Sequence, residues 1–365
     1  MCLDCRNYRV RYACNRSPIR TVFIIKIIIL IKKAFIFSIF FCFYFSVNAQ
    51  DPFLSQWFTS AQFLSPASVG NGVYNSRIQS NYRSQMLAGN QLYKTIVIGW
   101  DGRYKNKNED VVNYLGIGGQ IISDQIMEGV LQTNYATINA AYHLYFDDDL
   151  KKNFSLGLGL TFAQSNLQLD KLKFGDQFLE GEYISNSRSV SLQNLSGSAS
   201  KISMNSGLLY TYHSASSFFQ ISANAFYLAK PDLISENPSA STFKSLIFFN
   251  AEKEVESKKS FMLHASFNSR NKMDQLLVGG SIGLPFGSYI ENSNKFYLGC
   301  FYRVNDAIIP MVSILMNEYR FGFSYDIYSN DFSKAQLKPT SFELSLSVSS
   351  LLGKRRSDNL RTLFD

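Results

Sequence analysis

The side chains that could do chemistry in this sequence are few and scattered. The sequence has three histidines, His143, His213 and His264, and the alternation around them predicts that all three point inward from strands. A metal site or a hydrolase needs its ligands, or a nucleophile with its base and orienting group, within hydrogen-bonding distance. Polar packing of an interior explains inward histidines equally well. We therefore predict no catalytic residues, no metal site and no bound cofactor.

Two other patterns, a glycine run and the cysteines, are even weaker indications of a binding site or a disulfide. Gly116, Gly118 and Gly119 form a G-x-G-G run, but no helix is predicted to follow it, and a phosphate-binding loop needs one. Four of the five cysteines lie within residues 1–49, which leaves only Cys300. One cysteine cannot form an internal disulfide.

Charged residues on neighbouring segments form a more specific group. An arginine that faces lipid at mid-bilayer costs about 2 to 4 kcal/mol, so we expect Arg320 to face inward, and the same reasoning places Glu343 inward. With Arg303 and Asp326 they form a candidate polar network in one lumen. The favoured interpretation is a salt-bridge network that packs the interior. A dedicated partner-binding role is the alternative.

The elements that position these residues are strands with a period of two. In residues 153–163, NFSLGLGLTFA, large apolar side chains occupy one phase, and Ser, Gly and Thr occupy the other. Residues 132–146 and 319–328 alternate in the same way, with polar side chains on one phase only. A strand with one apolar face and one small or polar face suits a barrel wall that meets lipid outside and a lumen inside.

Fourteen such segments follow the first 72 residues, bounded by polar or Gly, Asn and Asp clusters. Their predicted cores are 73–85, 94–104, 111–122, 132–146, 153–164, 202–213, 217–229, 241–251, 259–269, 275–285, 295–304, 308–316, 319–328 and 340–349. We therefore predict an all-β fold, a transmembrane antiparallel outer-membrane β-barrel of about 14 strands over residues 73–350. An even number places both chain ends in the periplasm, and the longest linker, 165–201, then lies outside, where barrels carry long loops.

Residues 1–49 read as a leader and signal peptide. Lys32 and Lys33 precede a 14-residue apolar run, 34–47, which is short for a membrane-spanning helix and normal for a signal sequence. Cleavage is expected near Ala49 and Gln50, with delivery to the outer membrane. An uncleaved inner-membrane anchor is the alternative.

The charge balance changes once this leader is set aside. Of the 36 basic and 28 acidic residues, the leader holds eight and one, which leaves 28 against 27. This balance gives no basic surface for nucleic acid. Residues 351–365 form a basic C-terminal tail.

The segment between the leader and the first strand is unusually apolar. We expect residues 50–72 to lie in the periplasm, where Phe53, Trp57 and Phe58 need cover. Two interpretations stay open. The segment is either a plug or rim packed against the barrel base, or a docking surface for other secretion components.

Several motifs then follow one another in a recognisable order. Q-D-P-F-L-S-Q-W-F begins at Gln50, S-P-A-S-V-G at Ser65 and N-Y-R-S-Q at Asn81, and they are followed by L-G-I-G-G-Q-I-I-S-D-Q-I-M-E-G, A-Y-H-L, NFSLGLGLTFAQ, L-G-C-F-Y-R and F-S-Y-D. Together they resemble the PorP/SprF membrane proteins of the Bacteroidota type IX secretion system and gliding machinery. The chain departs from that pattern at Ser65, where the family has Asn, at 340–343, TSFE in place of G-S-H-E, and across 165–201.

The resemblance implies a non-enzymatic outer-membrane component that supports export or surface attachment of a cargo protein, such as an adhesin with a type IX C-terminal domain. The implied partners are outer-membrane lipid, other type IX secretion components and that cargo. Two other classes remain open. One is a passive porin or hydrophobic-solute transporter, and the other is an outer-membrane hydrolase, which would need outer-loop acids or histidines placed together.

Overall fold

The computed structural model describes residues 53–104, 113–147, 149–172, 174–179, 182–183, 197–227, 244–270, 273–287, 294–329 and 339–351. The leader, the first three residues of the expected periplasmic segment and the basic tail beyond residue 351 lie outside these ranges. Within them, no helix is long and apolar enough to cross a membrane.

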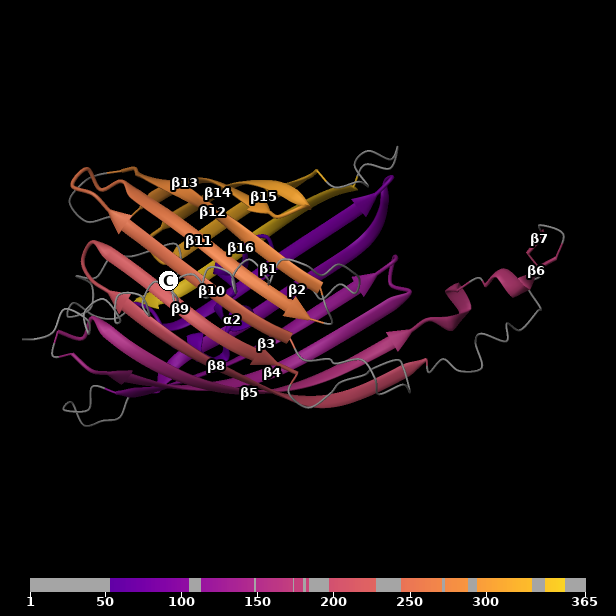
Figure 1. Cartoon of the computed structure of the whole chain (residues 1–365), viewed down its shortest axis with the longest axis horizontal. Coiled ribbons are helices and arrows are strands. Elements are labelled where there is room, and N and C mark those ends of the chain that lie inside the picture. The colour runs from indigo at the N-terminus through magenta and orange to yellow at the C-terminus, as the bar shows by residue number, and fades with distance from the viewer. Residues whose placement is uncertain are drawn as a thin grey trace, which may run out of the picture. The chain divides into compact units, whose positions relative to one another are not determined.

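Fourteen strands form one closed antiparallel barrel (Figure 1). They are β1 (Tyr74–Leu87), β2 (Asn90–Tyr104), β3 (Tyr114–Ile126), β4 (Leu131–Tyr145), β5 (Lys152–Leu167), β8 (Ser198–His213), β9 (Ser217–Phe226), β10 (Lys244–Glu254), β11 (Ser260–Arg270), β12 (Met273–Pro285), β13 (Lys295–Arg303), β14 (Ala307–Met316), β15 (Tyr319–Tyr328) and β16 (Pro339–Leu351). Each strand pairs with its neighbour along the chain, and β16 pairs with β1 to close the barrel. The predicted fold class is confirmed.

Every predicted segment coincides with one of these strands. The largest difference lies in the linker expected over 165–201, because β5 continues to Leu167 and β8 begins at Ser198. Between them two short strands, β6 (Phe178–Leu179) and β7 (Glu182–Tyr183), pair with each other. Pairs of this length leave too short an alternation to be seen in a sequence.

The wall separates an apolar outer face from an inner face, as the period of two requires. On β5, Leu156, Leu158 and Leu160 are exposed, whereas Ser155 and Thr161 are buried on the opposite phase. Arg320 and Asp326 are buried on β15, and Glu343 is buried on β16. Exposed leucines in these numbers are stable on a barrel that meets lipid.

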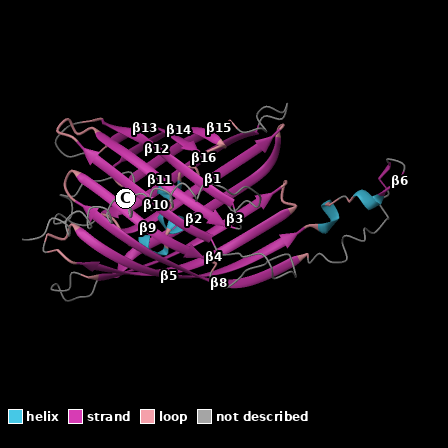
Figure 2. Ribbon diagram, viewed as in Figure 1, coloured by secondary structure: helices cyan, strands magenta, loops and turns pink. Residues whose placement is uncertain are grey.

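The segment expected in the periplasm instead lies inside the barrel, which corrects that prediction. From Phe53 onward it forms η1 (Trp57–Thr59), α2 (Ala61–Leu64) and η2 (Pro66–Ser68), the short helices drawn within the wall in Figure 2. Nearly all of its side chains are buried, and they contact inward residues of strands on several sides of the barrel. We call residues 53–73 the N-terminal segment.

The inner wall is not uniformly polar. Strands β10 to β14 turn large apolar side chains inward, and these pack with the apolar residues of the N-terminal segment in one core: Leu54, Trp57, Phe58, Leu64, Leu246, Phe248, Met262, Leu277, Tyr297, Phe301, Ile309, Met311 and Leu315. On these strands both faces are apolar, so the alternation alone does not reveal which phase lies inside.

Inverting the polarity of the outer face should destabilise the barrel. Leu158 lies near the middle of β5 and is exposed on the lipid-facing phase. Leu158→Arg should lower the free energy of unfolding in lipid vesicles by about 2 to 4 kcal/mol, measured by denaturant titration. Leu158→Met, which keeps the volume and the apolar character, should change it by less than about 1.5 kcal/mol. Equal stability of both variants would contradict the assigned phase.

Candidate functional site

A buried carboxylate on β16 holds the start of the N-terminal segment. Glu343 accepts hydrogen bonds from the backbone N–H groups of Ser55 at 2.6 Å and Gln56 at 3.0 Å, and from Asn81 Nδ2 at 3.0 Å. The carboxylate oxygens thus give buried N–H donors the acceptors that they would otherwise lack. Two successive backbone donors also fix the direction of the chain at this point.

A second carboxylate, Asp326 on β15, completes the contact. It accepts a hydrogen bond from Ser55 Oγ at 2.8 Å and forms ion pairs with Arg83 at 2.9 Å and Arg303 at 2.8 Å. Arg83 also lies 3.8 Å from Glu343, its direct partner in the pairing of β1 with β16. We call these seven residues the Glu343 anchor: Ser55, Gln56, Asn81, Arg83, Arg303, Asp326 and Glu343.

The structure brings together three of the four charged residues singled out in the sequence, namely Arg303, Asp326 and Glu343. Arg320 is buried on β15 six residues before Asp326, which is about 20 Å along a strand, so it lies outside the anchor. Sequence reasoning missed Arg83. Two features of the sequence could have revealed it. Arg83 lies in the N-Y-R-S-Q motif, and closure of the barrel brings the first strand, which carries it, against the last strand, which carries Glu343.

Gln56 extends the anchor along β15 and β16. Its Nε2 donates to the Glu343 carbonyl at 2.7 Å, and its Oε1 accepts from Ser345 Oγ at 2.6 Å. The side chain lies over Gly322, where any Cβ would overlap Gln56 Oε1. The two signature residues Ser55 and Gln56 therefore act as structural contacts within the barrel.

A separate carboxylate, Asp101 on β2, holds the other end of the segment. It accepts hydrogen bonds from the Gly70 N–H at 2.8 Å and from the Tyr74 hydroxyl at 2.6 Å, and it pairs with Arg77 at 3.1 Å. Arg103 Nε donates to the Gly70 carbonyl at 2.8 Å. We call these five residues the Asp101 anchor. Both ends of the segment are thus fixed to the wall by buried charged groups.

The three histidines are structural neighbours of the segment or of the wall. His143 Nε2 lies 2.7 Å from the Val69 carbonyl oxygen and its Nδ1 lies 2.7 Å from Ser155 Oγ. His264 stacks on Trp57 with ring centroids 3.2 Å apart, and His213 makes an edge contact with Phe218. In the part of the chain that the structure describes, no group of three or more His, Cys, Asp and Glu residues could hold a metal ion.

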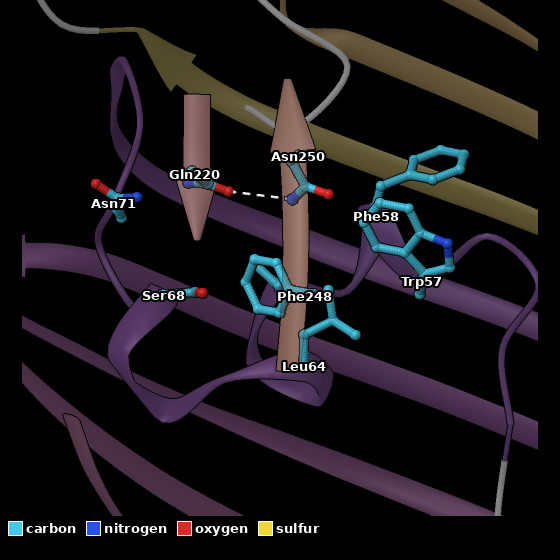
Figure 3. A pocket seen from close by; sticks show the side chains of 9 residues that line it. Trp57, Phe58, Leu64, Ser68, Asn71, Gln220, Phe248 and Asn250 are labelled. Atoms are coloured by element: carbon cyan, nitrogen blue, oxygen red, sulfur yellow. Dashed lines mark hydrogen bonds between the residues drawn. The ribbon is translucent and has the colours of Figure 1, made fainter. Parts of the chain in front are cut away.

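The apolar face of the segment fills the other side of the lumen. Trp57 and Phe58 are each 2% exposed, so these two side chains do not form the open docking surface that we considered for them together with Phe53. A cavity of about 20 Å³ remains beside them, lined also by Leu64 and Phe248 (Figure 3). A second cavity of about 20 Å³ lies between the segment and Leu277. Each has room for about one water molecule.

Inward glycines make room for the segment. A Cβ on Gly116 would overlap the Val69 carbonyl, and one on Gly157 would overlap the backbone of Pro66 and Ala67. The alternation of glycine and leucine on β5 therefore has three causes. Lipid selects the leucines, close approach of the N-terminal segment selects Gly157, and the inward Asn139 side chain on β4 selects Gly159.

This close packing predicts opposite tolerances for two glycines on the same strand. Gly116→Ala on β3 should lower the midpoint of thermal unfolding, because overpacking a well-filled interior costs about 1 to 3 kcal/mol. Gly119→Ala is the matched control, because that glycine faces outward and the nearest atom to an added Cβ is 3.4 Å away. A Gly116→Ala protein as stable as its Gly119→Ala counterpart would show that the segment does not pack there.

Weakening the Glu343 anchor should also be measurable. In Glu343→Gln an amide replaces one carboxylate oxygen, so a buried backbone N–H loses its acceptor, and we expect a loss of about 1.5 to 3 kcal/mol in the free energy of unfolding. Glu318→Gln, in the exposed turn between β14 and β15, should change it by less than about 0.5 kcal/mol. Denaturant titration of both purified proteins checks the difference. Equal effects of the two substitutions would show that Glu343 does not hold the N-terminal segment.

Solved structures with a similar fold are distant in sequence. A deletion mutant of the monoaromatic hydrocarbon channel TodX has 7% identity and a TM-score of 0.48, covering 80% of this chain and 94% of that one. The monoaromatic hydrocarbon channel CymD has 11% identity and a TM-score of 0.45, covering 84% and 95%. A Pseudomonas aeruginosa FadL homologue has 8% identity and a TM-score of 0.47, covering 80% and 94%. What these channels carry is not transferable at such identities.

Comparison at the level of sequence gives the family. No curated protein matches the chain. A family model described as type IX secretion system membrane protein PorP/SprF matches residues 46–348. That range includes the whole N-terminal segment and all but the last residues of β16. The motifs that resemble this family supply both anchors, Ser55 and Gln56 at one end and Gly70 at the other. The chain belongs to the PorP/SprF family of type IX secretion system membrane proteins.

Proposed function

We propose that this protein is a non-enzymatic outer-membrane component of the type IX secretion or gliding machinery, and that it supports export or surface attachment of a cargo protein. In this proposal the barrel acts as a membrane-held binding platform. Its partners are a cargo with a type IX C-terminal domain, such as an adhesin, and other components of the machinery. The mature chain begins near Gln50 after signal peptide cleavage.

The filled lumen is the observation that carries this proposal over a solute channel. The N-terminal segment contacts β16 and β15 through Glu343 and Asp326, β2 through Asp101, and the apolar wall through Trp57. Among the described residues, two cavities beside the segment have room for about one water each. A passive porin needs a continuous aqueous path, and a transporter needs a cavity of its solute's size.

The histidine contacts favour a platform over a hydrolase. Ser155 and His143 are within hydrogen-bonding distance, but both are completely buried, and the second ring nitrogen of His143 lies against the Val69 carbonyl. A nucleophile must reach its substrate. A Ser–His pair beneath the N-terminal segment is better explained as part of the packing that holds η2 in place.

Deleting the gene tests the platform against the channel. We expect one surface protein with a type IX C-terminal domain to disappear from the outside of the cell, measured by proteomics of surface-labelled material. Uptake of small hydrophilic and hydrophobic dyes should change little. If the cargo stayed on the surface while uptake of a solute collapsed, the transporter function would replace the one proposed.

Complementing that strain locates the function within the barrel. Wild-type protein should restore export, whereas Trp57→Asp combined with Phe58→Asp should not, because two charges enter a closed apolar core. Leu158→Met is the matched control on the lipid face and should restore export fully. Heat-modifiable migration on gels reports whether each barrel has assembled. If the double variant assembled and still exported the cargo fully, cargo handling would not depend on the packed segment.

A further inference from the structure

The N-terminal segment has a defined direction inside the barrel. The Phe53 ring lies beneath the guanidinium groups of Arg303, at 4.8 Å, and Arg83, at 5.8 Å. Arg303 is the last residue of β13, and Arg83 lies four residues before the end of β1. Four antiparallel pairings lead from β1 through β16, β15 and β14 to β13 in the barrel order, so β1 and β13 run in the same direction. The segment therefore starts near the rim at which β1 and β13 end.

The other end of the segment lies at the opposite rim. Arg103, the residue before the last of β2, donates to the carbonyls of Gly70 and Gly72. The hydroxyl of Tyr114, the first residue of β3, donates to the Gly70 carbonyl at 3.1 Å. From there the chain enters β1 at Tyr74. In twenty residues it has crossed the whole lumen.

Connection lengths distinguish the two rims. The rim near Phe53 carries the connections 168–197, 227–243 and 329–338, whereas the longest connections at the opposite rim are 105–113 and 286–294. Outer-membrane barrels have long outer loops and short periplasmic turns. The rim near Phe53 is therefore the outer one, and β1 and β16 have their free ends at the periplasmic one.

We propose that the N-terminal segment is threaded through the barrel from the periplasmic rim to the outer rim, so that Phe53 lies at the mouth of the barrel that faces the outside of the cell. The Asp101 anchor holds the periplasmic end and the Glu343 anchor holds the outer end.

The threading has a consequence for assembly. Both ends of the segment are tied to the wall by buried charged groups, and Gly116 and Gly157 lie against its backbone at Val69, Pro66 and Ala67. We therefore expect the strands to close around a segment that is already in place.

Cysteine labelling on intact cells tests the proposal. In a Cys300→Ser background, Asp51→Cys reports the chain before Phe53, Asn90→Cys reports the rim near Phe53 and Ala215→Cys reports the opposite rim. With a membrane-impermeant maleimide we expect Asp51→Cys and Asn90→Cys to be labelled at least tenfold more than Ala215→Cys. Permeabilising the outer membrane should make Ala215→Cys equal to them. The parent with only Cys300→Ser should remain unlabelled in both states.

Three results would overturn the proposal: labelling of Asp51→Cys only after permeabilisation, no labelling of it in either state, or a reversed pattern for Asn90→Cys and Ala215→Cys. An epitope inserted between Gln50 and Asp51 gives a second readout if the cysteine variant assembles poorly, and antibody binding to intact cells should match the labelling. The labelling results do not depend on any cargo. The threading proposal can therefore fail while the deletion strain still loses its surface protein, and the proposed function can fail while the labelling pattern is as expected.

Discussion

Fourteen strands enclose more space than their inward side chains can fill. Barrels of eight strands have an interior of about side-chain width, and those of sixteen to eighteen leave a channel. In this protein the N-terminal segment fills the interior space that the inward side chains leave empty. Its apolar side chains pack against the apolar wall of β10 to β14, and its backbone lies on glycines of β3 and β5. The barrel and the segment are therefore one folded unit, and neither has a complete core without the other.

Charged groups determine where the segment lies along that lumen. Apolar packing is non-directional and would tolerate a shift of the segment, whereas Glu343 and Asp101 accept hydrogen bonds from particular backbone N–H groups. Each carboxylate is compensated by an arginine from a neighbouring strand. Removing one partner of a buried ion pair is destabilising where it leaves the other charge uncompensated. The two anchors thus select one position for the segment among many that would bury similar area.

The family motifs acquire a common physical meaning from these contacts. Ser55 and Gln56, Asn81 and Arg83, Arg303, and Asp326 come from four motifs far apart in the chain, and all meet around one carboxylate cluster. In this chain these motifs hold the N-terminal segment inside the barrel.

The sequence by itself determined the strands and most of their faces. A bilayer outside the wall imposes a period of two, so Leu156 and Leu158 faced lipid and Arg320, Asp326 and Glu343 faced inward without knowledge of any contact. Only the tertiary structure decided that the N-terminal segment lies within the barrel, that Arg83 links Asp326 to Glu343, and that β10 to β14 turn apolar residues inward. Residues such as Ser55 and Glu343 are 288 positions apart, and periodicity reports the local environment of a strand, not which distant segment fills the space beside it. Closing the barrel is the step that brings the first strand against the last, and the contacts of the lumen exist only after that closure.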